Sequence, residues 1–584
     1  MSGLENPRSG RIRFLTLIWC AFIVRGIFYS AIFPIWEGYD EPFHFAFIQY
    51  LVTREALPLP TTPVSREVQA SLHVLPLPGT LLRHGYPAPM ITHDEFWRLD
   101  DRQREQLEQR FRNIPEEWTK EPATEPIRNY EAQQPPLYYA LFSVILRCIG
   151  VLDLASRILL LRVFGVIVAS VSIPFGYLAA TKVLRNETSS LGIVTLAAVM
   201  PEMMVNISRI ANESVSITLY TVLVYVALKI VDGPEHFCHL SLVGLLLGLG
   251  LLSKAYFLTA LPALVVVLVC CFWRWPQHWT RLAFHSGLMM VIGAVMAGWW
   301  YWRAHRLMGS WSGLYSEAAV RRISNWEMLQ HVLHVNWLSA LISVLLSHIW
   351  YGGWSFLRVS NFVYVAFGAV VLLAVCGVAV LLFKLREASA SAQEESVHPA
   401  CFLVLIGFYG FFWLGLAYQV LTLYVSERAS ASTGWYMYCL IIPELILAYW
   451  GLQAVLPNRL HSWIVPILTG AFALLDLYGM HFLLIPYYSG LISHSAIYRG
   501  VFSHSTLSLV LPARVQDFIQ TGLSGLTNRL LVNKSPFLTS STIFLLWLMY
   551  IVATLYLLAS SRKMITARQY SERQNGTLKG RPTL

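Results

Sequence analysis

Residues 13–45 read RFLTLIWCAFIVRGIFYSAIFPIWEGYDEPFHF and join a long apolar segment to a short acidic one. The apolar part, Arg13 to Pro34, is long enough to cross a bilayer core of roughly 30 Å as a helix. It is longer than the apolar region of a secretory signal peptide and has no small-residue cleavage site, so we expect a first membrane anchor. The carboxylates Asp40 and Glu41 follow it. Charge close to hydrocarbon is costly, which makes this pair a functional candidate, although a solvated acidic turn has the same pattern.

The composition is that of an integral membrane protein. Only 13% of the 584 residues are charged, against about 25% in soluble proteins, and 56% are hydrophobic. Apolar blocks of about twenty residues recur along the chain, which predicts an all-α polytopic membrane protein with about twelve transmembrane helices. The predicted spans are residues 13–34, 158–181, 189–207, 214–231, 238–253, 255–273, 282–302, 361–383, 400–423, 434–453, 462–482 and 540–560.

Basic residues predict the orientation of these spans. The net charge of +10 comes largely from short Lys/Arg clusters between apolar blocks, so it reports membrane orientation and gives no sign of a nucleic-acid partner. Arg8, Arg11 and Arg13 precede the first span and Arg562 and Lys563 follow the last, which places both termini in the cytoplasm and requires an even number of crossings. The even number follows if residues 135–151, opened by two prolines, form an interfacial helix that does not cross.

This orientation divides the chain into four parts. A transmembrane domain covers residues 1–482 and includes a long first external loop, 35–157; an external loop covers 483–539, a last transmembrane helix 540–561, and a cytoplasmic tail 562–584. In the first loop, residues 91–112 have the amphipathic pattern of a surface helix. Residues 333–349 are a second candidate for an external interfacial helix. The polar tail and the charged loop 387–395 are expected to lack regular structure.

Polar side chains recur at the predicted external ends of the spans. Gln134 and Tyr138 open the interfacial helix, Glu213 begins a crossing, and Lys254 lies in a short outer turn. Arg303 and His305 follow a tryptophan-rich helix end. Each has a simple structural interpretation, such as a favourable acidic first turn for Glu213 or a lysine that reaches the headgroups. Together, however, they are predicted on the membrane face that also carries Asp40.

These motifs resemble the GT-C glycosyltransferases, and more narrowly the branch of protein mannosyltransferases and aminoarabinose transferases with its bacterial relatives. The resemblance rests on Asp40-Glu41 with His44, on Gln134-Pro135-Pro136-Leu137-Tyr138-Tyr139, on Asn212-Glu213 and on the Gly-x-Gly-x-Leu-x-Lys pattern that ends at Lys254, all within the first 310 residues. The chain departs from the family at Gln134, where His or Lys is frequent, and at Glu213, where Asp is common. The resemblance gives no role to residues 433–436.

The resemblance implies a GT-C-like bundle that transfers a sugar from a polyprenyl-phosphate donor to a hydroxyl acceptor on the external face of a bacterial inner membrane. Asp40 would be the base that takes the acceptor proton. Glu41 would orient the loop or the acceptor, and His44 would position Asp40. Further residues are expected to bind substrate, with the cations stabilising the leaving phosphate: Gln134, Tyr138, Glu213, Lys254, Arg303 and His305.

Several questions stay open at this stage. The expected mechanism is an inverting single displacement, and the sequence leaves a divalent metal open because Asp40, Glu41 and Glu213 show no metal-ligand spacing. The sugar is not indicated, and the acceptor is a protein, a lipid or a glycan. A transporter or flippase for lipid-linked sugars is one alternative. Such a protein should have ionisable residues near the middle of its spans, but most spans here lack them, and the exceptions are Arg25, Glu444 and Asp476. A polysaccharide polymerase or ligase is the other.

Overall fold

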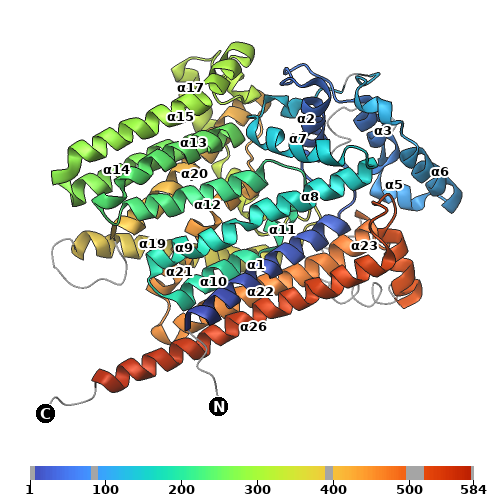
Figure 1. Ribbon diagram of the computed structural model, residues 1–584. Helices are drawn as coiled ribbons and strands as arrows, with labels where there is room; N and C mark the ends of the chain where they lie inside the picture. Colours follow the sequence, from blue (N-terminus) through green and yellow to red (C-terminus); the bar gives the residue numbers. More distant parts are fainter. Residues whose placement is uncertain (1–6, 80–89, 126, 389–398, 495–518, 580–584) are drawn as a thin grey trace.

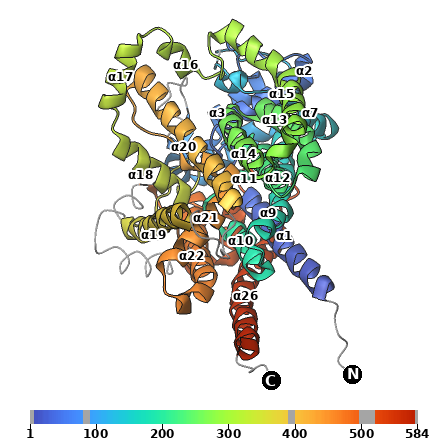
Figure 2. The ribbon, with the colours of Figure 1, turned by 90° about the vertical axis from the view of Figure 1, so that its left-hand side faces the viewer.

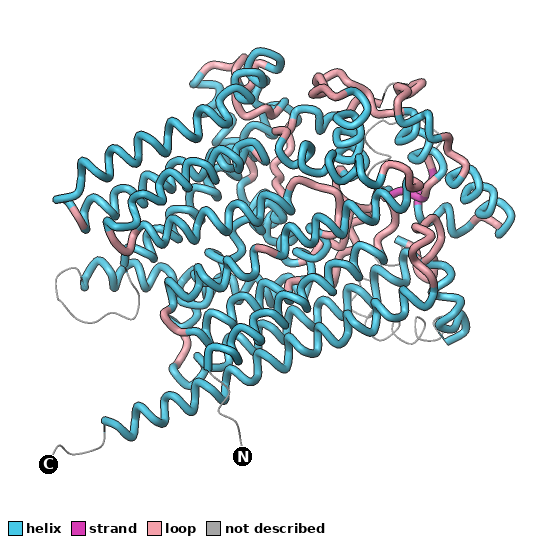
Figure 3. The backbone as a smooth tube through the Cα atoms, in the orientation of Figure 1, coloured by secondary structure: helices cyan, strands magenta, loops and turns pink. Residues whose placement is uncertain are grey.

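A computed structural model describes residues 7–79, 90–125, 127–388, 399–494 and 519–579 of the chain. Most of these residues are helical, and loops connect the helices (Figure 3). The strands within them are β1 (Pro76–Leu77) and β2 (Ile91–Thr92), which pair in parallel. The predicted all-α class is therefore confirmed.

Eleven helical segments of the described residues are long and apolar enough to cross a membrane, and two bent helix pairs raise the number to thirteen if each pair is one span. Every one of the twelve predicted spans coincides with one of these segments or pairs. The helices of the eleven segments are α1 (Pro7–Ile32), α8 (Leu154–Ser170) with α9 (Ser172–Leu184), α12 (Glu213–Ile230), η3 (Pro234–His239) with α13 (Leu240–Ser253), η4 (Ala255–Thr259) with α14 (Ala260–Arg274), η5 (Pro276–His278) with α15 (Trp279–Met308), α19 (Asn361–Ala388), α20 (Pro399–Glu427), η6 (Gly434–Leu440) with α21 (Ile441–Val455), η7 (Asn458–Trp463) with α22 (Ile464–Tyr478), η8 (Gly479–Leu484) and α23 (Ile485–Tyr488), and α26 (Ser540–Lys579).

The predicted span 189–207 is broken. It consists of α10 (Glu187–Val199) and α11 (Pro201–Ile207), which meet at 62°. Pro201 is the first residue of α11, and proline cannot donate the backbone hydrogen bond that would continue α10. The carbonyls of Ala198 and Val199 at the break accept hydrogen bonds from the Arg25 guanidinium instead.

The long loop over residues 35–157, predicted to be the first external loop, folds into short helices. They are α2 (Glu41–Arg54), α3 (Arg66–Val74), α5 (His93–Arg98), α6 (Asp101–Arg112), η1 (Glu116–Thr119), η2 (Tyr130–Gln133) and α7 (Leu137–Ile149). The prediction of one surface helix over residues 91–112 was wrong. Thr92 and Asp100 each form a capping box, with Glu95 and Gln103 respectively, so two helices begin where one was expected.

Helical elements are present at both positions where an interfacial helix was expected, residues 135–151 and 333–349. Helix α7 has 13 residues and is therefore about 20 Å long, too short to cross a core of roughly 30 Å. It packs against α2 in the first external loop. Residues 333–349 overlap the second bent pair, α17 (Asn325–His334) and α18 (Trp337–Ile349), which follows α16 (Tyr315–Val320).

Both ends of the chain lie at one end of the bundle, and the helices of the first external loop lie at the other (Figures 1 and 2). The expected loss of regular structure after Arg562 was wrong, because α26 continues to Lys579 through a sequence without proline. Helical structure continues to Tyr488, five residues beyond the predicted start of the late external loop at residue 483. Most of the predicted loop 387–395 lies outside the described residues.

Candidate functional site

Asp40 occupies a left-handed turn at the start of α2. It is the N-cap residue of this helix, with φ 58° and ψ 11°, and its side chain makes no capping hydrogen bond. Aspartate tolerates this backbone conformation better than most residues other than glycine. The turn thus leaves the Asp40 carboxylate free to point away from the helix end.

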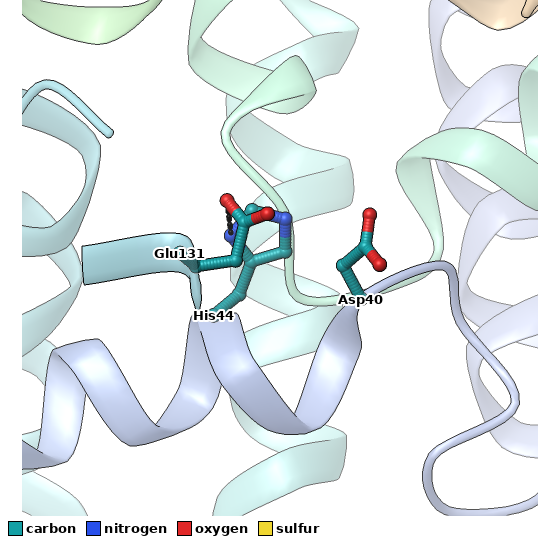
Figure 4. Close-up of side chains that lie close together, drawn as sticks. All are labelled: Asp40, His44 and Glu131. Atoms are coloured by element: carbon teal, nitrogen blue, oxygen red, sulfur yellow. Dashed lines mark ion pairs between the residues drawn. The ribbon is translucent and has the colours of Figure 1, made fainter. Parts of the chain in front are cut away.

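The Asp40 carboxylate belongs to a cluster with His44 and Glu131 (Figure 4). Tyr130 donates its hydroxyl hydrogen to Asp40 Oδ1. One helical turn beyond Asp40, His44 Nδ1 lies 2.8 Å from the Tyr139 hydroxyl and 3.6 Å from Glu131 Oε2. His44 and Glu131 are buried, with 3% and 5% of their surfaces exposed, whereas Asp40 is partly exposed. Asp40 is therefore the most exposed member of the cluster.

Burial sets the protonation of this cluster. Desolvation lowers the pKa of His44 to about 3, so its imidazole is neutral at physiological pH. Desolvation raises the pKa of Asp40, while the Tyr130 hydrogen bond and the nearby cations Arg209 and Lys254 oppose the rise. The pKa of Glu131 is raised well above its ordinary value, first by burial and then by the charge of Asp40.

Cations approach this cluster from two neighbouring connections. Lys254 forms a buried ion pair with Glu213 and donates to Asn212 Oδ1 at 2.8 Å. Arg209 Nη2 lies 3.4 Å from Glu213 Oε2, and the same guanidinium donates to the carbonyl of Tyr39, next to Asp40. Glu213 therefore orients both cations, and Lys254 does not extend freely to the headgroups, as its simplest interpretation would require.

The Glu41 side chain has different partners from that of its neighbour Asp40. Its side chain is fully buried, and Arg162 Nε and Nη2 donate to its two carboxylate oxygens at 2.7 and 2.5 Å. The backbone NH of Ile210 donates to Glu41 Oε1 at 3.0 Å. The two adjacent carboxylates thus make separate contacts, and Glu41 links the loop to α8 and to the α11–α12 connection.

Gln134 and Tyr138 also border the cluster. Asn212 Nδ2 donates to Gln134 Oε1 at 3.3 Å, which joins the first external loop to the turn that carries Glu213. The ring of Tyr138 is buried, and its centroid is 6.4 Å from that of His44. Both predicted residues therefore lie beside the Asp40 cluster.

Arg303 and His305, by contrast, have contacts outside this cluster. Arg303 Nη2 donates to the carbonyl of Pro58 at 2.9 Å. The ring of His305 stacks on Trp311 at 4.2 Å, and its Nδ1 lies 2.9 Å from Arg321 Nη1. The prediction grouped these residues with Lys254 because all follow predicted span ends, but the ends of different helices need not adjoin. We find no contact of either residue with the cluster among the described residues.

Sequence reasoning missed four residues of the site. Glu131 and Arg209 were not singled out, although Glu131 lies three residues before the Gln134 motif and Arg209 three residues before Asn212. Trp435 stacks on Tyr39 at 4.0 Å, and Lys254 Nζ lies 5.1 Å from the ring centroid of Tyr436. These two aromatic residues come from η6, nearly 200 positions along the chain from Lys254, and no local pattern links them to it.

The comparisons with known proteins give one structural likeness. No family model matches the chain, and no curated protein matches it. Among solved structures the chain is similar to the crystal structure of ArnT from Cupriavidus metallidurans bound to undecaprenyl phosphate, with 12% sequence identity, a TM-score of 0.41, and coverage of 95% of this chain and 78% of that chain.

Proposed function

We propose that this protein transfers a sugar from a polyprenyl-phosphate donor to a hydroxyl acceptor at the Asp40 cluster, on the external side of a bacterial inner membrane. The observation that carries the proposal is the position of Asp40. Its partly exposed carboxylate has no capping role and lies at the edge of a buried group that includes the cations Lys254 and Arg209. A proton acceptor beside anchored cations fits an attack by a hydroxyl on a carbon whose leaving group is an anion.

Asp40 would take the proton from the acceptor hydroxyl as the acceptor oxygen attacks the anomeric carbon. In a single displacement the bond from the sugar to the phosphate oxygen breaks as the new glycosidic bond forms, so the product has inverted configuration. The hydrogen bond from Tyr130 leaves the second oxygen of Asp40, Oδ2, as the better placed acceptor. The left-handed turn supports this role, because it directs the carboxylate away from its own helix.

Lys254 and Arg209 would stabilise the departing phosphate. The positions of both cations are fixed before the donor arrives, through Glu213 and the Tyr39 carbonyl, so little reorganisation is needed during the reaction. Tyr436 lies against Lys254 and is partly exposed, which makes it a candidate for contact with the sugar or the lipid phosphate. Arg303 and His305 are left out of this phosphate site because their contacts lie elsewhere.

The proposal is tested by Asp40→Asn in full-length protein reconstituted with a panel of polyprenyl-phosphate sugars and candidate acceptors. We expect the variant to bind donor lipid as the wild type does and to lose transfer by about 10²–10⁴-fold, because asparagine keeps the size of the side chain and cannot accept the proton. The matched control is Asp153→Asn. Asp153 is also an N-cap residue, outside the cluster, and asparagine caps helices equally well.

Two results would count against the proposal. Transfer that is unchanged in Asp40→Asn would assign Asp40 to structure. Flux of a lipid-linked sugar across vesicles, without turnover of any donor, would favour the transporter instead.

A further inference from the structure

We propose that Asp40, His44 and Glu131 bind a divalent first-row transition-metal ion, such as Mn²⁺ or Zn²⁺, inside the candidate active site. Each residue offers one ligand atom, and these atoms all lie within 4.8 Å of one another. Ligands that share one ion at about 2.0–2.2 Å are separated by no more than about 4.4 Å, so the cluster closes on an ion with small side-chain movements. The inference rests on the proposed function only where it concerns the donor phosphate.

Glu131 provides the first independent observation. Its side chain is 5% exposed, yet Oε2 accepts no hydrogen bond from the described residues. A buried carboxylate oxygen without a partner costs free energy unless a cation or a proton compensates it. Figure 4 shows the Glu131 carboxyl group beside the His44 ring, with its Oε2 3.6 Å from His44 Nδ1. The carboxyl group that lacks a hydrogen bond therefore belongs to the cluster, and one of its oxygens can turn toward a shared ion.

His44 provides the second observation, because its ring is already oriented as a metal ligand requires. Nδ1 lies 2.8 Å from the Tyr139 hydroxyl, and the other ring nitrogen, Nε2, points toward Asp40 (Figure 4). A metal-ligating histidine usually makes such a second contact through the nitrogen that does not bind the ion. An imidazole whose hydrogen lies on Nδ1 presents a lone pair at Nε2.

The charges of the surrounding groups favour a cation. Asp40 and Glu131 interact electrostatically with each other and with Glu213, Arg209 and Lys254. Three carboxylates thus face two cations, and the group has one excess negative charge when all are ionised. A donor phosphate would then approach a negative site. A divalent ion reverses the sign of the net charge, and this reversal is the contribution that the ion would make to the binding of an anionic lipid.

The donor set indicates the class of ion. Mg²⁺ and Ca²⁺ prefer oxygen ligands only, whereas a mixture of two carboxylates and one imidazole suits Mn²⁺, Zn²⁺ and their first-row neighbours. Three protein ligands would leave coordination positions open. The partly exposed Asp40 marks the side on which these positions face the substrate.

The test is direct measurement of ion binding. Full-length protein in nanodiscs is stripped with a chelator and titrated with Mn²⁺, and electron paramagnetic resonance quantifies the bound ion. We expect one ion per chain, with the dissociation constant raised by more than about tenfold in Glu131→Gln and in His44→Gln, and by about tenfold in Tyr139→Phe. Bound Mn²⁺ should show coupling to a nitrogen nucleus, and His44→Gln should abolish it.

Matched variants outside the cluster serve as controls. Glu125→Gln and His73→Gln make the same chemical changes in the first external loop and should bind Mn²⁺ as the wild type does. Absence of saturable binding in the wild type would overturn the metal site, as would unchanged affinity in Glu131→Gln or binding without nitrogen coupling. A protein that binds Mn²⁺ as expected but turns over no lipid-linked donor would instead leave the metal site standing and overturn the proposed function.

Discussion

At the scale of single residues, the adjacent side chains of Asp40 and Glu41 have different partners. Glu41 is fully buried and its two oxygens accept from Arg162, whose guanidinium also donates to the carbonyls of Phe33 and Pro34 at 2.9 and 2.8 Å. We expect Glu41→Gln to leave a buried arginine without its counter-charge and to lower the free energy of unfolding by roughly 3–5 kcal/mol.

Thermal unfolding of purified protein measures this effect, with Asp40→Asn as the comparison that should retain a nearly unchanged midpoint. A Glu41→Gln protein that unfolds like the wild type but transfers no sugar would show that Glu41 is needed for the reaction and not for stability.

The same residues indicate how far the sequence could predict the site. Asp40, Glu41 and His44 are adjacent along the chain, so a short motif contains them. Glu131 and Tyr436 reach the site only through the packing of α2 and η2 and of η6 on α12, and a hydropathy pattern has no information about such contacts. Lys254 interacts electrostatically with Asp40, whereas Arg303, which also follows a predicted span end, contacts the Pro58 carbonyl. Residue type and position at a helix end therefore give a list of candidate residues. The tertiary contacts show which of these residues lie together.

At the scale of helices, the break between α10 and α11 depends on a buried ion pair. Arg25 donates to carbonyls at the break and pairs with Asp476 at 2.9 Å, and Asp476 in turn accepts from Tyr29 at 2.5 Å and Tyr550 at 2.7 Å. The predicted spans were correct in position because the length of each apolar run can be read directly from the sequence. The 62° bend was not predicted, because its stabilising partner comes from a distant helix.

This pair gives a prediction at the same scale. We expect Arg25→Met and Asp476→Asn each to reduce the thermal midpoint and the yield of folded protein, because each variant leaves a buried partner unpaired. The double variant should lose less than the sum of the single losses, since it removes both charges. Lys182→Met is the control: Lys182 pairs with Asp232 at a more exposed position, where an ion pair contributes about 0–1 kcal/mol. Additive losses in the double variant would show that Arg25 and Asp476 act independently.

At the scale of the whole molecule, the Asp40 cluster combines segments from residue 39 to residue 436, and all of them must meet on one side of the membrane. The termini lie at the opposite end of the bundle from the first external loop (Figure 1). With basic residues at both termini, the positive-inside rule predicts that the cluster lies outside. A cysteine introduced at Glu117, in η1 of the first loop, should therefore react with a membrane-impermeant maleimide in intact cells.

A cysteine at Arg459, in η7 between two spans, should react only after the cells are permeabilised. Labelling of the parent protein, which has eight cysteines of its own, sets the background for both measurements. The two variants distinguish the two orientations, because an inverted protein would have residue 459 outside the cell and residue 117 inside it. Labelling of Arg459→Cys but not of Glu117→Cys in intact cells would place Asp40 on the cytoplasmic side, where the donor sugar and the acceptor proposed here would not reach it.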